Sequence, residues 1–386
     1  MIIITYRNVV VSRMVVRLGG VRGLEGRRND VLFAPAARRV PDGVPRALVY
    51  WGGDVQDYPE VMQAHRDNHN YLKWNLENTA RMLSQNFPTR HIVVVRPSRI
   101  EYKSFSCYDN FVPSNNAGVP DHTPTHSALL HLQRLLQQVS NRIKAIPEDE
   151  LLEALDAASL PEDVDIEDLH VSLIVINHCS SKKIRGRVNS SFFKNLHYDG
   201  VGVAISVCPH LGSQIQIVVT LFTRGSGSPR LWWRPQLALQ EARLSLAGFS
   251  KGCVVLNQLL YEFHYTATLT PADRHASRFI SSIEAMYWLD GGHAGGRNTW
   301  LTSRCLLETL ARLNVEIYVH VSPYQVQDET RPWIGREEKT FTALLKKLGA
   351  NVSPSLNAGN VIVFSYTVSF SLRISMAYCQ VKKQGS

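Results

Sequence analysis

The chain has 386 residues, of which 44% are hydrophobic and 19% are charged. This composition excludes a wholly disordered or fibrous protein, and the length favours one main α/β domain with insertions. The net charge of +9 comes from 42 lysines and arginines against 33 acidic residues. A basic protein can bind nucleic acid, bind a membrane surface or carry an import signal, and the position of the basic residues in the chain distinguishes these functions.

The N-terminal segment is basic and has no acidic residue before Glu25. Its arginines are interleaved with apolar residues, which is typical of a mitochondrial presequence, and we expect residues 1–40 to be a presequence with a lead-in. The alternative is an unprocessed, disordered basic terminus, because β-branched runs in this segment favour a helix only weakly. No apolar run reaches the roughly 20 residues of a transmembrane helix, so we expect a soluble protein. The arginines of the basic N-terminal segment are Arg7, Arg13, Arg17 and Arg22.

The first half of the chain predicts alternating strands and helices. Residues 47–51 and 91–95 are short apolar runs closed by glycine or proline, and both are predicted to be buried strands. Between them, residues 75–87 place apolar side chains at helical spacing, with Asn75 as a possible N-cap. A strand, a helix and a strand in about 50 residues form a βαβ unit, which requires a parallel sheet.

A helix is predicted at residues 124–146, and the acidic segment 147–168 is interpreted as a helix or a solvated face. Residues 147–240 are interpreted as an insertion, because polar and glycine-rich loops alternate there with apolar runs at 201–207 and 215–222. A lid, a cap and a poorly ordered segment are the alternatives for this insertion.

The regular pattern returns with a strand at residues 243–248, followed by a sharp turn and a helix at residues 253–263. Further elements are predicted downstream. The sequence therefore predicts an α/β-hydrolase-like domain over residues 46–358, with a mostly parallel central sheet flanked by helices and a variable insertion before the nucleophile strand. The downstream elements are strands at 285–289 and 315–321 and a helix at 337–348 that Gly349 ends.

The turn Gly248-Phe249-Ser250-Lys251-Gly252 matches the nucleophile-elbow pattern, in which small residues let a strand reverse into a helix and expose a serine hydroxyl. Such a string also arises by chance, but the strand before it and the helix after it are the expected context. Ser250 is therefore the candidate nucleophile, with a structural turn as the alternative.

A serine nucleophile needs donors for the oxyanion that it creates. The backbone amide of Lys251, directly after the nucleophile, is the expected first donor. Gly53 lies in the glycine-rich loop after the first predicted strand and is the expected second donor, because glycine permits close approach to substrate. A plain glycine-rich turn is the alternative for that loop.

The catalytic acid should follow the nucleophile in the chain, and the base should follow the acid. Asp290 and Asp328 follow successive strands, and Asp328 is preferred because it comes one strand later; either could instead be a helix cap or a solvated loop residue. No histidine follows Asp328, since the last one is His320. His293 and His320 are candidates for the base, with a structural role as the alternative for each.

The six cysteines form no C-x-x-C pair, which supports neither a zinc site nor a disulfide framework, and favours a reducing compartment. We expect no metal and no cofactor. Nucleic acid is not expected as a partner, because the excess arginine is concentrated at the N-terminus and accompanies no recognised binding motif.

The sequence resembles a mitochondrial protein family, that of the human chromosome 2 open reading frame 69 protein. The matching strings run in order over about residues 46–350, apart from residues 147–240, where the family varies. They include Trp51-Gly-Gly-Asp-Val-Gln-Asp-Tyr58, Phe105-Ser-Cys-Tyr-Asp-Asn-Phe-Val112, Gly248-Phe-Ser-Lys-Gly-Cys-Val-Val-Leu-Asn-Gln258, Met286-Tyr-Trp-Leu-Asp-Gly-Gly-His293 and Pro323-Tyr-Gln-Val326. The resemblance implies an α/β-hydrolase-like fold, a mitochondrial location, and a serine hydrolase of unestablished substrate with Ser250 as nucleophile.

The C-terminal tail departs from this resemblance. Family members end with a histidine-containing segment, whereas residues 359–386 contain no histidine and no acidic residue. The tail is therefore interpreted as atypical, with the hypothesis that the triad base and the last sheet element are missing.

Two functions follow from these observations. The first is a mitochondrial serine hydrolase, expected in the matrix, that acts on an ester or thioester of a small acyl substrate through an acyl-Ser250 intermediate. The second is a non-catalytic protein of the same fold that supports mitochondrial metabolism by binding a partner. The elbow favours the first, and the missing histidine favours the second.

Overall fold

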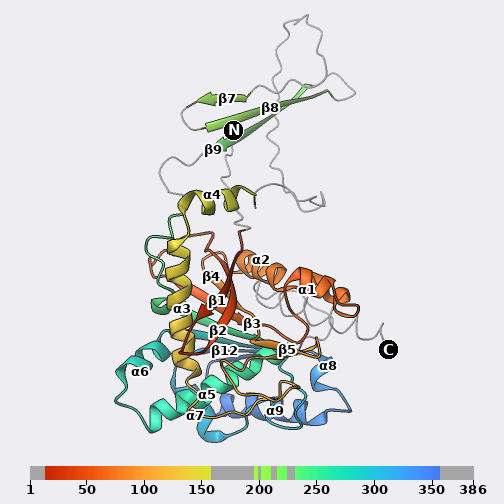
Figure 1. Cartoon of the computed structure of the whole chain (residues 1–386), viewed down its shortest axis with the longest axis vertical. Helices are drawn as coiled ribbons and strands as arrows, with labels where there is room; N and C mark the ends of the chain where they lie inside the picture. Colours follow the sequence, from red (N-terminus) through yellow and green to blue (C-terminus); the bar gives the residue numbers. More distant parts are fainter. Residues whose placement is uncertain (1–13, 158–194, 199–200, 210–214, 224–230, 357–386) are drawn as a thin grey trace, which may run out of the picture. The chain divides into compact units, whose positions relative to one another are not determined.

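The computed structural model describes residues 14–157, 195–198, 201–209, 215–223 and 231–356. The chain forms two compact units, one made of residues 1–159 with 233–386 and the other of residues 160–232 (Figure 1). None of the helices within the described residues is long and apolar enough to cross a membrane.

The larger unit is built on an eight-stranded sheet with the order β1-β2-β4-β3-β10-β11-β12-β13. β2 runs antiparallel to both of its neighbours, and all strands from β4 to β13 in this order are parallel. The central strands are apolar almost throughout, as expected for a parallel sheet that is covered on both faces. The strands are β1 (Val16–Arg22), β2 (Arg28–Ala34), β3 (Arg46–Trp51), β4 (His91–Val95), β10 (Arg243–Phe249), β11 (Ile283–Leu289), β12 (Glu316–Val321) and β13 (Val352–Leu356).

Helices cover both faces of this sheet (Figure 1). In β11, Tyr287 and Leu289 pack into the core beneath α2, whereas the indole of Trp288 points to the other face and donates a hydrogen bond to Asn257 of α5. This alternation follows from the two-residue period of a strand. The helices are α1 (Pro59–Gln63), η1 (Asn68–Trp74), α2 (Leu76–Asn86), α3 (Ala128–Ala145), α4 (Glu148–Ala157), η3 (Leu239–Glu241), η4 (Ser250–Gly252), α5 (Cys253–Thr268), α6 (Arg274–Ser281), α7 (Arg304–Arg312), α8 (Pro323–Val326) and α9 (Pro332–Lys347).

The strand order, the helices on both faces and the strand-to-helix turn at Ser250 are those of an α/β hydrolase, as predicted. The predicted strands at 47–51, 91–95, 243–248, 285–289 and 315–321 are confirmed as β3, β4, β10, β11 and β12.

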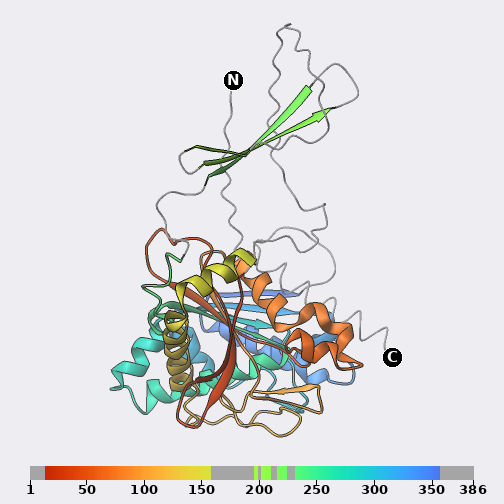
Figure 2. The ribbon, with the colours of Figure 1, turned by 45° about the horizontal axis from the view of Figure 1, so that its top comes forward.

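The described residues also form two small antiparallel sheets, one in each unit. β5 (Arg99–Glu101) and β6 (Phe105–Cys107) form a hairpin in the larger unit. The second unit contains β7 (Asn195–Tyr198), β8 (Val201–Pro209) and β9 (Ile215–Thr223), which form a three-stranded meander (Figure 2). Both apolar runs noted in the insertion are thus strands of one sheet.

The prediction that residues 1–40 are a presequence with a lead-in is corrected by the structure of the N-terminal region. The segment expected to be presequence and lead-in contains β1 and β2, and Leu18 and Val21 of β1 are buried. Arg17 forms ion pairs with Glu60 and Glu77. An edge strand in which basic and apolar residues alternate has the same basic, acid-poor composition as a presequence. A presequence therefore stays a prediction for residues 1–13 alone, which lie outside the described residues.

The hypothesis of a missing last sheet element is also wrong, because β13 pairs in parallel with β12 and completes the eight strands. Residues 359–386 lie outside the described residues.

Candidate active site

Ser250 lies at the turn between β10 and α5 with a φ angle of +50°. This left-handed conformation is costly for a residue that has a β-carbon. The two glycines of the motif make the turn possible: a β-carbon on Gly248 would stand 2.8 Å from the backbone of Cys253, and one on Gly252 would stand 2.0 Å from the carbonyl oxygen of Trp51. The side chain of Ser250 is partly exposed. The local geometry is that of a nucleophile elbow.

The loop after β3 lies directly against the elbow. A β-carbon on Gly53 would stand 3.1 Å from Cβ of Ser250. The amide of Gly53 donates a hydrogen bond of 2.8 Å to Oε1 of Gln56, whose own amide donates to the carbonyl of Trp74. The Gly53 amide therefore lies beside Ser250, but it can bind an oxyanion only after giving up its hydrogen bond to Gln56.

Lys251 contributes a buried cation to the same region. Its side chain is fully buried, and its ammonium donates to the carbonyl of Ala117 across 2.7 Å and lies 3.7 Å from Oδ1 of Asp54. Burial lowers the pKa of Lys251, and the charge of Asp54 opposes this shift. Because Asp54 also accepts a hydrogen bond from the amide of Ser106, the cation links the elbow to the Gly53 loop and to β6.

Asp290 lies at the carboxyl end of β11, the neighbour of β10, and is buried. Its carboxylate accepts hydrogen bonds from the amide and the hydroxyl of Ser322, at 2.8 and 2.9 Å. Two residues later, the amide of Gly292 donates to the carbonyl of Ser250 across 3.3 Å. The loop that begins at Asp290 is thereby attached to the elbow.

His293 follows in this loop and is buried. Its Nδ1 accepts a hydrogen bond of 3.0 Å from the amide of Gly295, which places the proton of the neutral ring on Nε2. Burial lowers the pKa of His293 to about 4, so the ring is neutral at pH 7. A triad base accepts a proton at Nε2, and this tautomer does not.

Asp328 lies in the turn before α9 and has local partners. Its carboxylate accepts hydrogen bonds from the amide and hydroxyl of Thr330 and from Arg331. The hydrogen bond of the Thr330 hydroxyl, followed by that of Arg331, lowers the pKa of Asp328 to about 2. His320, in β12, is buried, and burial lowers its pKa to about 4.

The sequence model of the C2orf69 family matches residues 17–351. The chain is 36% identical over 338 residues to the mitochondrial protein C2orf69 homolog of Mus musculus, with 87% of this chain and 80% of the relative covered. It is 34% identical over 335 residues to the mitochondrial protein C2orf69 of Homo sapiens, with 87% and 75% covered. This chain belongs to the C2orf69 family.

Among solved structures, the chain is similar to the esterase Est22, with 10% identity and a TM-score of 0.35 over 95% of this chain and 79% of that one. It is also similar to the carboxylesterase of Bacillus cereus, with 9% identity and a TM-score of 0.32 over 92% and 94% of the two chains. The fold of this C2orf69 family member is established by its own strand order and elbow.

Of the residues singled out in the sequence, the structure gathers Ser250, Lys251, Gly53, Asp290 and His293 around the elbow of this C2orf69 family member, because β3, β10 and β11 are adjacent and parallel. Asp328 instead accepts hydrogen bonds from Thr330 and Arg331 within its own turn. Within the described residues, no hydrogen bond reaches the hydroxyl of Ser250.

Three polar residues at this site were not singled out from the sequence. Gln56 binds the Gly53 amide, Ser322 binds Asp290, and Gln325 donates from Nε2 to the carbonyl of Asp290 across 3.1 Å. Gln56 and Gln325 occur in the strings that carry the family resemblance, which was the available signal. Ser322 follows the predicted strand at 315–321 directly, and strand-end position was its signal.

Proposed function

We propose that this chain is a serine hydrolase that cleaves an ester or thioester bond through an acyl-Ser250 intermediate. The observation that carries the proposal is the φ of +50° at Ser250, held between Gly248 and Gly252. A strained serine at the carboxyl edge of the sheet is the form in which α/β hydrolases present their nucleophile.

In the proposed reaction, Oγ of Ser250 attacks the acyl carbon and loses its proton to a base. The negative charge on the carbonyl oxygen is met by the amide of Lys251, because amides in the first turn of a helix have no partner within the helix. The bond to the leaving alcohol or thiol then breaks, and the leaving group takes up the proton. Water attacks the acyl-Ser250 ester, releasing the carboxylic acid and restoring the serine.

Asp290 is the proposed acid. It is buried at the end of the strand adjacent to the nucleophile strand, and its loop contacts the elbow through Gly292. The carboxylate of Asp328 is instead occupied by Thr330 and Arg331. His293 is the proposed base, but its ring must first lose the hydrogen bond from the Gly295 amide and change tautomer. Binding of substrate to this loop would drive that change.

The proposed location is the mitochondrial matrix. The relatives in Mus musculus, Homo sapiens and Danio rerio are named mitochondrial proteins, which supports the mitochondrion. A non-catalytic role in binding is the second candidate, because no described residue forms a hydrogen bond to the Ser250 hydroxyl.

The test is covalent labelling of the purified chain by a fluorophosphonate probe, with the labelled residue located by mass spectrometry. We expect labelling at Ser250 that is lost in Ser250→Ala. An unlabelled wild-type chain with a cooperative thermal transition would favour the binding role.

Within a labelled enzyme, Asp290→Asn should slow labelling by roughly tenfold or more, whereas Asp328→Asn should not, since only Asp290 would orient a base. Equal rates for the two variants would reject Asp290 as the acid.

A further inference from the structure

A groove between α3 and α6 lies at the opposite edge of the sheet from Ser250. It is lined by Val44, Arg243 and Ser282, which begin or precede β3, β10 and β11 at their amino ends. β10 spans seven residues, so about 20 Å separate this edge from the elbow. The groove is therefore distinct from the candidate active site.

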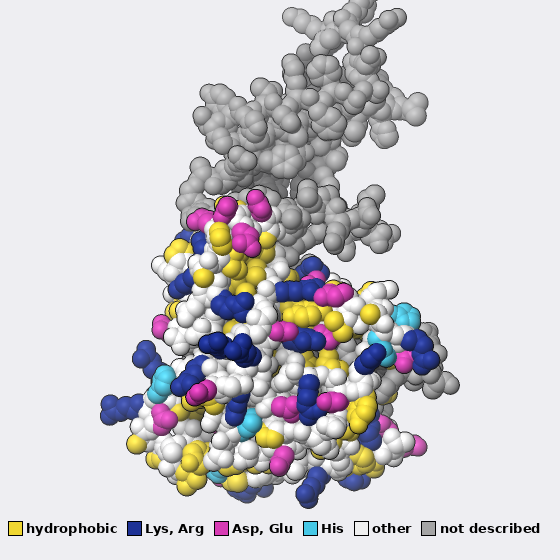
Figure 3. Space-filling view, viewed as in Figure 1, with side chains coloured by type: hydrophobic (Ala, Val, Ile, Leu, Met, Phe, Trp, Pro, Cys, Tyr) yellow, Lys and Arg dark blue, Asp and Glu magenta, His cyan; other side chains and the backbone are white. Residues whose placement is uncertain are grey.

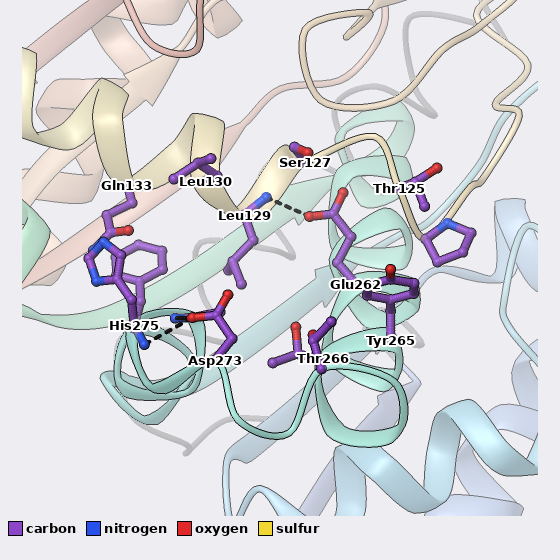
Figure 4. A pocket seen from close by; sticks show the side chains of 14 residues that line it. Thr125, Ser127, Leu129, Leu130, Gln133, Glu262, Tyr265, Thr266, Asp273 and His275 are labelled. Carbon is purple, nitrogen blue, oxygen red and sulfur yellow. Dashed lines mark hydrogen bonds between the residues drawn. The ribbon is translucent and has the colours of Figure 1, made fainter.

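Two adjoining hollows make up the groove. The smaller has a volume of about 310 Å³ and the larger a volume of about 700 Å³. They share Leu130, Gln133, His275 and Phe279, so the two hollows lie side by side. Figure 4 shows the smaller hollow, with Leu129 and Leu130 of α3 facing His275 of α6 and Tyr265 and Thr266 of α5. Together their volumes accommodate a ligand with two chemically different ends.

The larger hollow is basic. Arg134, Arg243 and Arg278 line it, and none of the three forms an ion pair with any residue in the described ranges. Glu241 is the acidic residue among the lining side chains that the structure describes. Neither α3 nor α6 contains an aspartate or a glutamate, and Lys and Arg side chains gather over α3 and beside α6 in the space-filling view (Figure 3). Three guanidinium groups that form no ion pair with a described residue, set against one glutamate in the lining, favour an anionic ligand.

The smaller hollow has no comparable free charge. The carboxylate of Glu262 accepts hydrogen bonds from the amides of Ala128 and Leu129, at the start of α3. Asp273 accepts from the amides of His275 and Ala276, at the start of α6 (Figure 4). Helix N-termini compensate both carboxylates. The remaining lining consists of hydroxyl, aromatic and aliphatic side chains with Gln133 and His275, and it suits an uncharged organic group.

We propose that this groove binds an organic phosphate monoester. The phosphate lies between Arg134, Arg243 and Arg278, since guanidinium groups pair with phosphate oxygens in a bidentate manner. The uncharged part of the ligand extends past Phe279 into the smaller hollow. A small phosphorylated metabolite and the headgroup of a phosphatidate-like lipid share this chemistry.

The test compares two double variants that remove one positive charge from each of the same two helices. Arg134→Gln with Arg278→Gln changes the groove, whereas Lys144→Gln with Arg274→Gln changes exposed residues of α3 and α6 that do not line it. Binding of phenyl phosphate is measured by calorimetry, with inorganic phosphate and phenol as the separate halves of the ligand. Cosedimentation with phosphatidylcholine vesicles containing phosphatidate tests the lipid source, and thermal unfolding verifies that both variants fold.

We expect the groove variant to weaken phenyl phosphate binding by roughly tenfold or more, and the matched variant to change it by less than about twofold. Inorganic phosphate and phenol should each bind more weakly than phenyl phosphate. Vesicle binding that is lost only in the groove variant would support the same site and identify a lipid headgroup as the source. Equal binding by the two variants, or no binding of either probe to the wild-type chain, would overturn the proposal.

Discussion

The α-carbon of Gly252 faces the carbonyl oxygen of Trp51 so closely that a β-carbon on Gly252 would stand 2.0 Å from that oxygen. Trp51 ends β3, and Gly252 ends the turn that follows β10, its neighbour in the sheet. The elbow therefore depends on contact between two strand ends as well as on its own backbone.

Gly252→Ala should destabilise the fold by about 3 kcal/mol, because the added carbon forces backbone to move in a packed region. Gly296→Ala is the matched control, since nothing lies within 4 Å of a β-carbon at Gly296, and it should change stability by less than about 0.5 kcal/mol. Urea unfolding measures both values. Similar stability of the two variants would mean that β3 and the elbow do not approach as described.

Ser250 carries backbone strain that glycine would relieve. With φ at +50°, Ser250→Gly should be more stable than Ser250→Ala by about 1 kcal/mol, because glycine adopts positive φ freely. At Ser277, inside α6, the order should reverse by about 1 kcal/mol, since glycine disfavours a helix interior. If Ser250→Gly and Ser250→Ala unfold at the same urea concentration, the strained elbow is absent in solution.

Lys251 should stabilise the fold through its buried contact with Asp54. Lys251→Met leaves the carboxylate of Asp54 and the carbonyl of Ala117 without their cation, and should cost about 3 kcal/mol. Adding Asp54→Asn should cost less in this variant than in the wild-type chain, by about 1 kcal/mol, because the two side chains interact. Lys346→Met, at an exposed position of α9, is the control. Additive losses in the double variant would contradict the ion pair.

Sequence patterns predicted those elements of the fold whose secondary structure is determined by a single short segment of the chain. β3 and β4 are apolar after their first residue, β10 is apolar apart from Arg243 and Ser245, and the elbow motif lies between a strand and a helix, so their local signals agree. β1 was missed because Arg17 and Arg22 interrupt it, and their partners are distant in sequence. Arg17 pairs with Glu60 and Glu77, which the chain order does not indicate.

The sequence predicted which residues of the candidate site lie near the elbow, but not which hydrogen bonds they form. Gly53 and Asp290 were found because parallel neighbouring strands bring their carboxyl ends together. Chain order also favoured Asp328, but it could not show that Thr330 and Arg331 occupy its carboxylate. The bond from Gly53 to Gln56 depends on a side-chain rotamer, which no sequence pattern specifies.

His131 should make the fold sensitive to mild acid. Its Nδ1 accepts from the amide of Leu24, its Nε2 pairs with Asn29, and burial lowers its pKa to about 3. The unfolded chain, with a histidine pKa of about 6.5, then binds more protons than the folded chain as pH falls below 6.5, so stability is lost from there toward pH 3. Between pH 6 and pH 4, the loss of stability attributable to His131 should be about 1.4 kcal/mol per pH unit.

His131→Gln should reduce the slope of stability against pH by that amount, measured by urea unfolding at each pH. A profile of His131→Gln that runs parallel to that of the wild-type chain would mean that His131 is protonated without cost and does not hold Leu24 as the structure shows.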